Sequence, residues 1–231
     1  MGVASFSNVF NNWSMGKSEE TRAKISETAL ASFKQRGYEQ TTLRLIASEV
    51  GVSVGNAYYY FPTKNHLVQE LYVRVQDEHL ERATSDLHGA TDLATRLERA
   101  LLAGIDTLGP FHDSATGFLA AAIGPQSPVS PFGEDAAAPR EAAIDVFRLV
   151  VSGASTSIPA DLRGRLPELL WLAYMGLALF WVYDRSVGQA KTRRLAHRAS
   201  KLFGSALPLA RLPFVRGPLN ELLDIIQEAR S

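Results

Sequence analysis

Apolar residues recur along most of the chain at the three- and four-residue spacing that is typical of amphipathic α-helices. One such pattern runs from Ser18 to Gly37, a short one follows from Thr42 to Val50, and a longer one begins after Thr63. We find no sustained alternation of apolar and polar residues between hairpin turns, which is the pattern of β-strands. The periodicity therefore predicts an all-α protein.

Beyond Gly89 the expected helices become longer and more apolar. The most hydrophobic run, residues 169–182, is shorter than the roughly 20 residues that a membrane-spanning helix needs, so it predicts a buried helix and no membrane span. Four prolines between residues 124 and 139 exclude a continuous helix and predict a long loop. The helices expected after Gly89 cover residues 92–108, 114–123, 139–152, 164–186, 190–207 and 217–229.

These patterns divide the chain into four expected parts. Residues 1–17 are expected to form a disordered arm, and residues 18–65 a small domain of three helices. Residues 66–88 are expected to form a linker helix, and residues 89–231 a larger helical domain.

Composition narrows the classes of function. The 231 residues carry 24 Lys and Arg against 24 Asp and Glu, which argues against a general binder of polyanions but leaves local basic patches open. The chain contains no cysteine, which excludes disulfides, thiolate metal sites and a cysteine nucleophile, and fits the reducing cytoplasm. The N-terminal residues have neither the basic start nor the apolar core of a secretory signal.

Nothing in the sequence has the arrangement of a catalytic or metal site. The five histidines form no compact zinc signature, and residues 153–157 lack the closing glycine of a nucleophile elbow. His112 and Asp113 are neighbours without an obvious nucleophile. We therefore expect no enzymatic activity, no metal and no cofactor.

One stretch, GVSVGNAYYYFPTK at residues 51–64, has the order of a helix-turn-helix. Gly51 suits the left-handed end of one helix, Ser53 suits the cap of the next, and Pro62 ends that second helix after two turns. A two-turn helix in this position can enter the major groove of DNA. The alternative is that the three tyrosines simply fill a core, as aromatic residues usually do.

The three tyrosines cannot share one role, because successive residues on a helix point about 100° apart. We expect Tyr58 and Tyr59 to face DNA, where a ring can touch a thymine methyl and a hydroxyl can reach a phosphate. Tyr60 or Phe61 is then expected to anchor the helix to its neighbours. Arg44 is the residue best able to read guanine, and the alternative for it is a solvated surface arginine.

The residues around this turn closely resemble the tetracycline-repressor (TetR) family of bacterial regulators. The family order is a threonine, Ile-Ala, Gly-Val-Ser/Thr, a glycine, a tyrosine with an aromatic pair, and a lysine. The residues that match it, within about residues 20–66, are Thr42, Ile46-Ala47, Gly51-Val52-Ser53, Gly55, Tyr58, Tyr59, Tyr60, Phe61 and Lys64. Ala57 and Pro62 depart mildly from the pattern, and neither threatens the fold.

This resemblance implies an N-terminal three-helix helix-turn-helix DNA-binding domain and a larger helical C-terminal domain for ligand binding and dimerisation. It also implies roles for individual residues. Phosphate contacts would come from Thr42, Tyr59, Tyr60 and Lys64, with Ser53 capping the recognition helix. The residues toward the bases would be Arg44, Val54, Gly55, Asn56 and Tyr58.

In the family, the last two large helices pair with their twins in a homodimer, and the C-terminal domain encloses a ligand cavity. The implied dimer residues are Leu172, Ala173, Gly176, Phe180, Tyr183, Leu195 and Leu202. The implied cavity walls are Leu101, Ile105, Phe111, His112, Phe118, Phe147, Trp171 and Tyr174, although aromatic residues at helical spacing are also ordinary core residues.

The resemblance therefore implies a cytoplasmic homodimeric repressor that binds a near-palindromic double-stranded operator and is released by a small apolar effector. Two alternatives stay open. The C-terminal domain can have a filled core and respond to a protein partner or to nothing, or, more remotely, the chain can be a helical enzyme.

Overall fold

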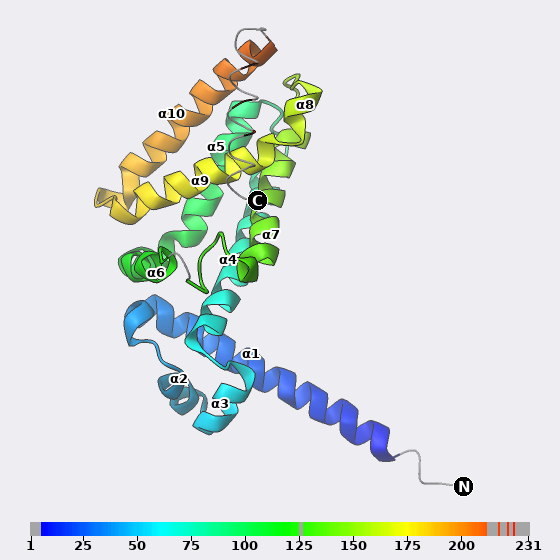
Figure 1. Cartoon of the computed structure of the whole chain (residues 1–231), viewed down its shortest axis with the longest axis vertical. Helices are drawn as coiled ribbons and strands as arrows, with labels where there is room; N and C mark the ends of the chain where they lie inside the picture. The colour runs from blue at the N-terminus through cyan, green and yellow to red at the C-terminus, as the bar shows by residue number, and fades with distance from the viewer. Residues whose placement is uncertain (1–5, 125–126, 212–216, 218–220, 222–223, 225–231) are drawn as a thin grey trace. The chain divides into compact units, whose positions relative to one another are not determined.

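The computed structural model describes residues 6–124, 127–211, 217, 221 and 224. Within them the chain consists of helices, turns and loops without a strand, which confirms the all-α prediction. The chain forms two compact units, whose helices are labelled in Figure 1. The first unit contains residues 1–72 and 113–135, and the second contains residues 73–112 and 136–231.

The first unit contains α1 (Phe6–Gln40), α2 (Leu43–Val50), α3 (Val54–Tyr60), the start of α4 (Lys64–Asp86) and α6 (Ala115–Ala122). Helix α1 begins well before the predicted start at Ser18, because the segment ahead of Ser18 has no proline to stop it. This differs from the disordered arm expected over residues 1–17, of which residues 1–5 lie outside the described part. Gly37 interrupts α1 with φ 77°, which matches the predicted end.

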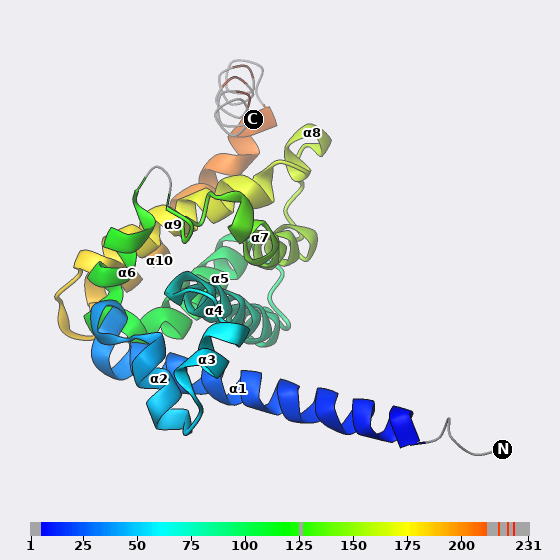
Figure 2. The ribbon, with the colours of Figure 1, turned by 60° about the horizontal axis from the view of Figure 1, so that its bottom comes forward.

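The core of the first unit is formed by the helix faces that α1 to α4 turn toward one another, with α2 and α3 lying against α1 (Figure 2). Its buried apolar side chains are Ile25, Ala29, Phe33, Leu43, Ile46, Ala47, Ala57, Phe61, Leu67, Val68 and Leu71. Most recur at the predicted three- and four-residue intervals. In α2 the buried side chains are those of Leu43, Ile46 and Ala47.

Residues 113–135 belong to the first unit although they follow α5 in the chain. Helix α6 packs on α1, where the Phe118 ring meets the rings of Phe33 and Tyr38. Within the proline-rich segment, Val129 is buried, and its carbonyl accepts a hydrogen bond from the Tyr72 hydroxyl at 2.9 Å. Burial raises the pKa of Tyr72 to about 12. The described part of the predicted loop is therefore packed against the first unit.

The second unit consists of the rest of α4, from Val73 to Asp86, and of helices that follow it in the chain. These are α5 (Leu93–Leu108), the 3-10 segment Gly109–Ser114, the 3-10 turn Glu134–Ala136, α7 (Ala137–Ser152), α8 (Ala160–Arg163), α9 (Leu166–Tyr183), the 3-10 turn Val187–Gln189, α10 (Ala190–Ala206) and a closing 3-10 turn Leu207–Arg211. Helix α10 packs on α5, and α9 packs on α7 (Figure 1). The predicted helix over 164–186 is shorter and preceded by α8, and the one over 217–229 lies almost entirely outside the described residues.

A buried arginine ties the ends of two helices of the second unit to α5. Arg96 lies on α5 with only 8% of its surface exposed. Its guanidinium group donates four hydrogen bonds to backbone carbonyls, those of Leu87, Ala90, Leu149 and Val150, at 2.6–3.2 Å. These carbonyls lie just after α4 and in the last turn of α7, near helix C-termini that carry partial negative charge.

The turn between α9 and α10 is organised by one buried carboxylate. Asp184 accepts hydrogen bonds from the backbone N–H and the hydroxyl of both Ser186 and Thr192, at 2.6–3.0 Å. Burial alone would raise the pKa of Asp184, but these four hydrogen bonds outweigh it and hold the pKa well below its ordinary value. The carboxylate therefore also satisfies backbone donors at the start of α10.

Candidate nucleic-acid interface

The turn between α2 and α3 is set by backbone hydrogen bonds at the end of α2. Gly51 adopts φ 77° and ψ 31°. Its N–H donates to the carbonyl of Ser48 at 3.3 Å, and the N–H of Val52 donates to the carbonyl of Ala47 at 3.0 Å. This pair of bonds is a Schellman motif, which requires a left-handed residue and favours glycine. Gly51 thus determines the direction in which the chain leaves α2.

Hydroxyl side chains cap both helices, and Ser53 does so at the position that the sequence predicts. Thr42 Oγ1 accepts a hydrogen bond from the N–H of Leu45, and Ser53 Oγ accepts one from the N–H of Asn56, both at 3.1 Å. Each cap satisfies a backbone donor that the helix leaves free and contributes about 1 kcal/mol. The seven-residue α3 depends on its cap more than a long helix would, since short helices are marginal by themselves.

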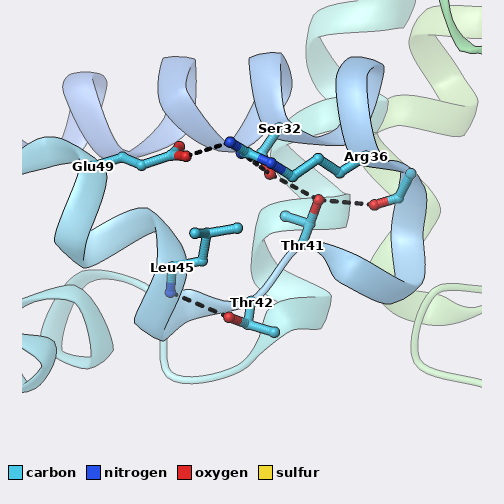
Figure 3. A network of polar contacts seen from close by, with 7 residues as sticks. Ser32, Arg36, Thr41, Thr42, Leu45 and Glu49 are labelled. Atoms are coloured by element: carbon cyan, nitrogen blue, oxygen red, sulfur yellow. Dashed lines mark hydrogen bonds and ion pairs between the residues drawn. The ribbon is translucent and has the colours of Figure 1, made fainter.

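A polar network connects the end of α1 to α2 (Figure 3). The Thr41 hydroxyl donates to the carbonyl of Gly37 at 2.8 Å and lies 3.0 Å from the buried hydroxyl of Ser32. Arg36 reaches the same Ser32 hydroxyl at 3.3 Å and forms an ion pair with Glu49 of α2 at 2.7 Å. Ser32 and Thr41 are buried, so the hydrogen bond between their hydroxyls forms in a shielded environment, and together with the more exposed Arg36–Glu49 pair it fixes α2 relative to α1.

Helix α3 has one buried and one exposed face. Ala57 and the C-capping Phe61 are buried, while Tyr58 and Tyr59 expose 48% and 77% of their surface. Val54 is also exposed, at the start of the helix. The aromatic cluster is therefore not simply core: its first two rings are presented to solvent, and Phe61 anchors the helix as the sequence predicts.

Tyr60 has a different environment from its two neighbours. It is half-buried, and its hydroxyl lies 3.0 Å from the hydroxyl of Ser18 on α1. Its ring meets that of Tyr59 edge to face, with centroids 5.2 Å apart. Ser18 lies inside α1, because the helix begins ahead of it, and its hydroxyl pairs with Tyr60. Tyr60 therefore holds α3 against α1, and its hydroxyl is already engaged with that of Ser18.

Lys64, the first residue of α4, is oriented by the end of α1. Its ammonium lies 3.8 Å from the centroid of the Tyr38 ring and 3.5 Å from the carbonyl oxygen of Glu39. Burial lowers the pKa of Lys64, and the nearby Glu39 carboxylate acts in the opposite direction. The sequence singles out Lys64 but not Tyr38, whose only local signal is its place directly after Gly37.

The other residues predicted at this interface lie on the same two helices and their caps. Thr42, Arg44, Ser53 and Gly55 are exposed, and Asn56 is half-buried. In the described part of the chain Arg44 has no ion-pair partner, so its guanidinium is available to a ligand. The exposed face thus combines a cation, aromatic rings and open backbone at Gly55, the groups that contact bases and phosphates.

Seven of the eight residues predicted to line a cavity are buried in the second unit: Leu101, Ile105, Phe111, His112, Phe147, Trp171 and Tyr174. The eighth, Phe118, packs in the first unit against Phe33 and Tyr38, because the chain returns to α1 after Ser114. His112 is tied to α9 through the carbonyl of Trp181, with Nε2 at 3.0 Å. Burial raises the pKa of Tyr174.

The burial of His79 in this core was not predicted from the sequence. His79, on α4, has no exposed surface, and its Nε2 lies 2.9 Å from the carbonyl of Ala100. A carbonyl only accepts, so Nε2 carries the proton and Nδ1 of the neutral ring is an acceptor. Nδ1 has no hydrogen-bond partner among the described residues, and neither has the buried Oε1 of Gln76, one turn earlier. Burial lowers the pKa of His79.

The residues predicted at a dimer interface form an apolar surface on α9 and α10. Ala173, Gly176, Phe180, Tyr183, Leu195 and Leu202 are exposed, and Leu172 is half-buried. Leu202 exposes 72% of its surface, and Val187, which the sequence did not single out, exposes 96%. Leu179 is exposed as well. Large exposed apolar side chains on two neighbouring helices are typical of a surface that another molecule covers.

The described residues show neither a metal-binding cluster nor strong signs of a membrane span. No group of three or more His, Cys, Asp or Glu side chains is placed to hold a metal ion there. Helix α9 is long and apolar enough to cross a membrane by length and composition, but 44% of it is buried inside the protein. Core helices of soluble proteins pass the same test, so this is weak evidence for a span.

Sequence profiles of two families match separate parts of the chain. The family described as "Bacterial regulatory proteins, tetR family" matches residues 25–71, which include α2, α3 and Lys64. The family described as "Tetracyclin repressor-like, C-terminal domain" matches residues 96–228, more than half of the chain.

Individual relatives resemble mainly the N-terminal part. The HTH-type transcriptional regulator TtgR of Pseudomonas putida is 41% identical over 70 residues, which are 29% of this chain and 33% of TtgR. The HTH-type transcriptional repressor KstR2 of Mycobacterium tuberculosis is 28% identical over 97 residues, 42% of this chain and 48% of KstR2. The chain thus spans less than half the length of these curated relatives.

Solved structures extend the likeness in fold to most of the chain. A tetR-family regulator from Streptomyces coelicolor superimposes with a TM-score of 0.55 at 23% identity, covering 91% of this chain and 97% of that one. FadR of Thermus thermophilus, a TetR-family transcriptional repressor solved with lauroyl-CoA, gives a TM-score of 0.57 at 20% identity, covering 79% and 94%. With two matching family profiles, a shared fold and a capped helix-turn-helix, the chain belongs to the TetR family of DNA-binding transcriptional regulators.

Proposed function

We propose that the chain is a cytoplasmic homodimeric repressor that binds a near-palindromic operator through α3 and is released by a small effector. The observation that carries the DNA-binding part is the exposed face of α3, where the side chains of Tyr58 and Tyr59 lie outside the core. Large aromatic side chains that are exposed together on one helix are typical of a surface that a partner covers.

Individual residues are assigned roles by their chemistry. Arg44 is proposed to read a guanine, since an exposed guanidinium can form a bidentate contact that discriminates by about 1–3 kcal/mol. Lys64, Thr42 and Tyr59 are proposed to contact phosphates, which position the protein without reading sequence. Tyr60 is proposed to take part with its ring edge, because its hydroxyl already pairs with Ser18.

A selection from a random duplex library by the purified wild-type protein tests this function. Arg44→Ala should change the preferred sequence. Lys64→Ala should weaken binding to selected and scrambled duplexes alike, and the slope of log affinity against log salt should fall by about one for each phosphate that is no longer neutralised. Glu19→Ala, an exposed change on α1, is a matched control. Equal decreases for both variants on both duplexes would contradict the separate roles.

Dimerisation is proposed to occur through α9 and α10. Two copies that bury Phe180, Tyr183 and Leu202 against each other would remove exposed apolar surface at about 25 cal/mol per Å². Light scattering should give a dimer for wild type and a monomer for Phe180→Glu. Val73→Glu, which changes an exposed apolar residue on α4, should leave the dimer intact. A monomeric wild type would refute this part.

The effector is proposed to be largely apolar with one hydrogen-bond donor. The surroundings of His79 are aromatic, with Tyr174 and Phe147 ring centroids at 5.2 and 6.5 Å, and within the described part of the chain Nδ1 is an unpaired acceptor. A buried acceptor without a partner costs about 1–3 kcal/mol, and a ligand hydroxyl or N–H would remove that cost. The lauroyl-CoA bound to the related FadR makes acyl-CoA thioesters one class to include in a search.

A thermal-shift screen of lipophilic metabolites, drugs and acyl-CoA thioesters tests the effector. Ligand at 100 times its dissociation constant adds about 2.7 kcal/mol, or several degrees for a chain of this size. Each apolar alcohol or phenol should be paired with its methyl ether, which removes the donor, and repeated on His79→Leu. A flat result across the set would favour a filled core and a regulator controlled by a protein partner or by nothing.

A further inference from the structure

The ammonium of Lys64 is held in place before any DNA arrives. Nζ lies over the face of the Tyr38 ring at 3.8 Å from its centroid, an attractive position because the face of an aromatic ring is negative. The Glu39 carbonyl lies within 3.5 Å of the same nitrogen. An ammonium has three N–H donors, and one ring face and one carbonyl leave a donor for a phosphate oxygen.

The Tyr38 ring is itself held on the side away from solvent. It is nearly parallel to the Phe33 ring, with an interplanar angle of 6° and centroids 6.5 Å apart. Phe118 of α6 meets it edge to face, with centroids 5.6 Å apart, and also meets Phe33 at 5.2 Å. A Cβ added to Gly117 would lie 3.4 Å from the Tyr38 Cβ, so α6 passes directly beside this tyrosine.

We propose that Tyr38 is a positioning residue for the contact between Lys64 and DNA, and that Phe118 of α6 fixes Tyr38 for this task. The inference rests on the proposed DNA-binding function. A free lysine side chain loses rotamer freedom when it is fixed on a phosphate, a cost of about 0.5–1.5 kcal/mol, or roughly two- to tenfold in affinity. The Tyr38 ring already restricts the Lys64 side chain in the free protein, so less rotamer freedom is lost when DNA binds.

The inference is tested by measuring the affinity for the duplex that wild type selects and for its scrambled version. Tyr38→Leu should weaken both by about two- to tenfold per protomer, and Tyr38→Phe should bind like wild type because the ring face remains. Phe118→Leu should weaken both by a smaller factor. Circular dichroism at the assay temperature confirms that each variant is folded, which separates positioning from loss of structure.

The decisive readout is a double-mutant cycle with Lys64→Ala. If Tyr38 acts through Lys64, Tyr38→Leu has no further effect in the Lys64→Ala background. An equal effect in both backgrounds, or a loss in Tyr38→Phe as large as in Tyr38→Leu, overturns the inference while DNA binding itself stands. A wild-type protein that binds no duplex refutes the DNA-binding function, and the inference fails with it.

Discussion

Replacing Arg96 by methionine should sharply destabilise the second unit. Methionine keeps much of the apolar stem but removes the four hydrogen bonds to carbonyls at the ends of α4 and α7. A hydrogen bond from a charged donor contributes about 1.5–3 kcal/mol. Four such bonds do not add up, because the substitution also removes the cost of burying the charge, so we expect a net loss of about 3–5 kcal/mol.

This loss corresponds to a melting temperature lower by about 6–20 °C, at 2–4 °C per kcal/mol for a chain of this size. Arg99→Met is the matched control, because Arg99 lies on the same helix, is exposed and donates to one carbonyl, that of Asp86 at 2.7 Å. Its effect should stay below about 1 kcal/mol. Equal and small shifts for the two variants in thermal and urea unfolding would refute the reasoning.

A substitution at Gly153 tests the same Arg96 guanidinium group. A Cβ on Gly153 would lie 2.2 Å from an Arg96 guanidinium nitrogen and 2.4 Å from its central carbon, so Gly153→Ala must displace the guanidinium. It should reproduce much of the destabilisation seen in Arg96→Met. In the Arg96→Met background Gly153→Ala should cost little, and additive effects would show that the glycine serves another purpose.

Other predictions concern pH and backbone conformation. Because burial lowers the pKa of His79, its neutral form supports the fold above the unfolded pKa of about 6.5, and stability falls as the pH drops below it. His79→Leu should flatten this fall in melting temperature, and the exposed His88→Leu should not. The lowered pKa of Asp184 stabilises the fold above about pH 4, and this stabilisation is lost as the pH falls further. Asp184→Asn should therefore lower the free energy of unfolding by about 1–3 kcal/mol at neutral pH and by progressively less in acid. Gly51→Ala should lower the free energy of unfolding in urea by about 1–2 kcal/mol, because φ is positive at this position. Gly55→Ala should leave stability unchanged and weaken only DNA binding, because a Cβ at this helical position meets no other atom. Equal destabilisation by the two substitutions would contradict this prediction.

The sequence by itself determined the helix-turn-helix. Thr42, Ser53 and Gly51 act on backbone groups within five residues, through hydroxyl caps and a left-handed turn, so their effect is the same in any tertiary context. The helical periodicity likewise placed α2 to α5 and α10 close to their observed bounds. Even the division of labour among the tyrosines follows from helix geometry, because residues 100° apart cannot face the same side.

Only the tertiary structure decided which distant residues complete these elements. Phe118 packs in the first unit, the Tyr38 ring contacts the Lys64 ammonium, and Arg96 donates hydrogen bonds to carbonyls at the ends of two helices. No local sequence pattern predicts any of these contacts. The same holds for His79, whose burial depends on α5, α7 and α9 closing around α4. Caps and turns depend on residues close together in the chain, so the local sequence predicts them. Burial and long-range pairing depend instead on which surfaces the whole fold brings together.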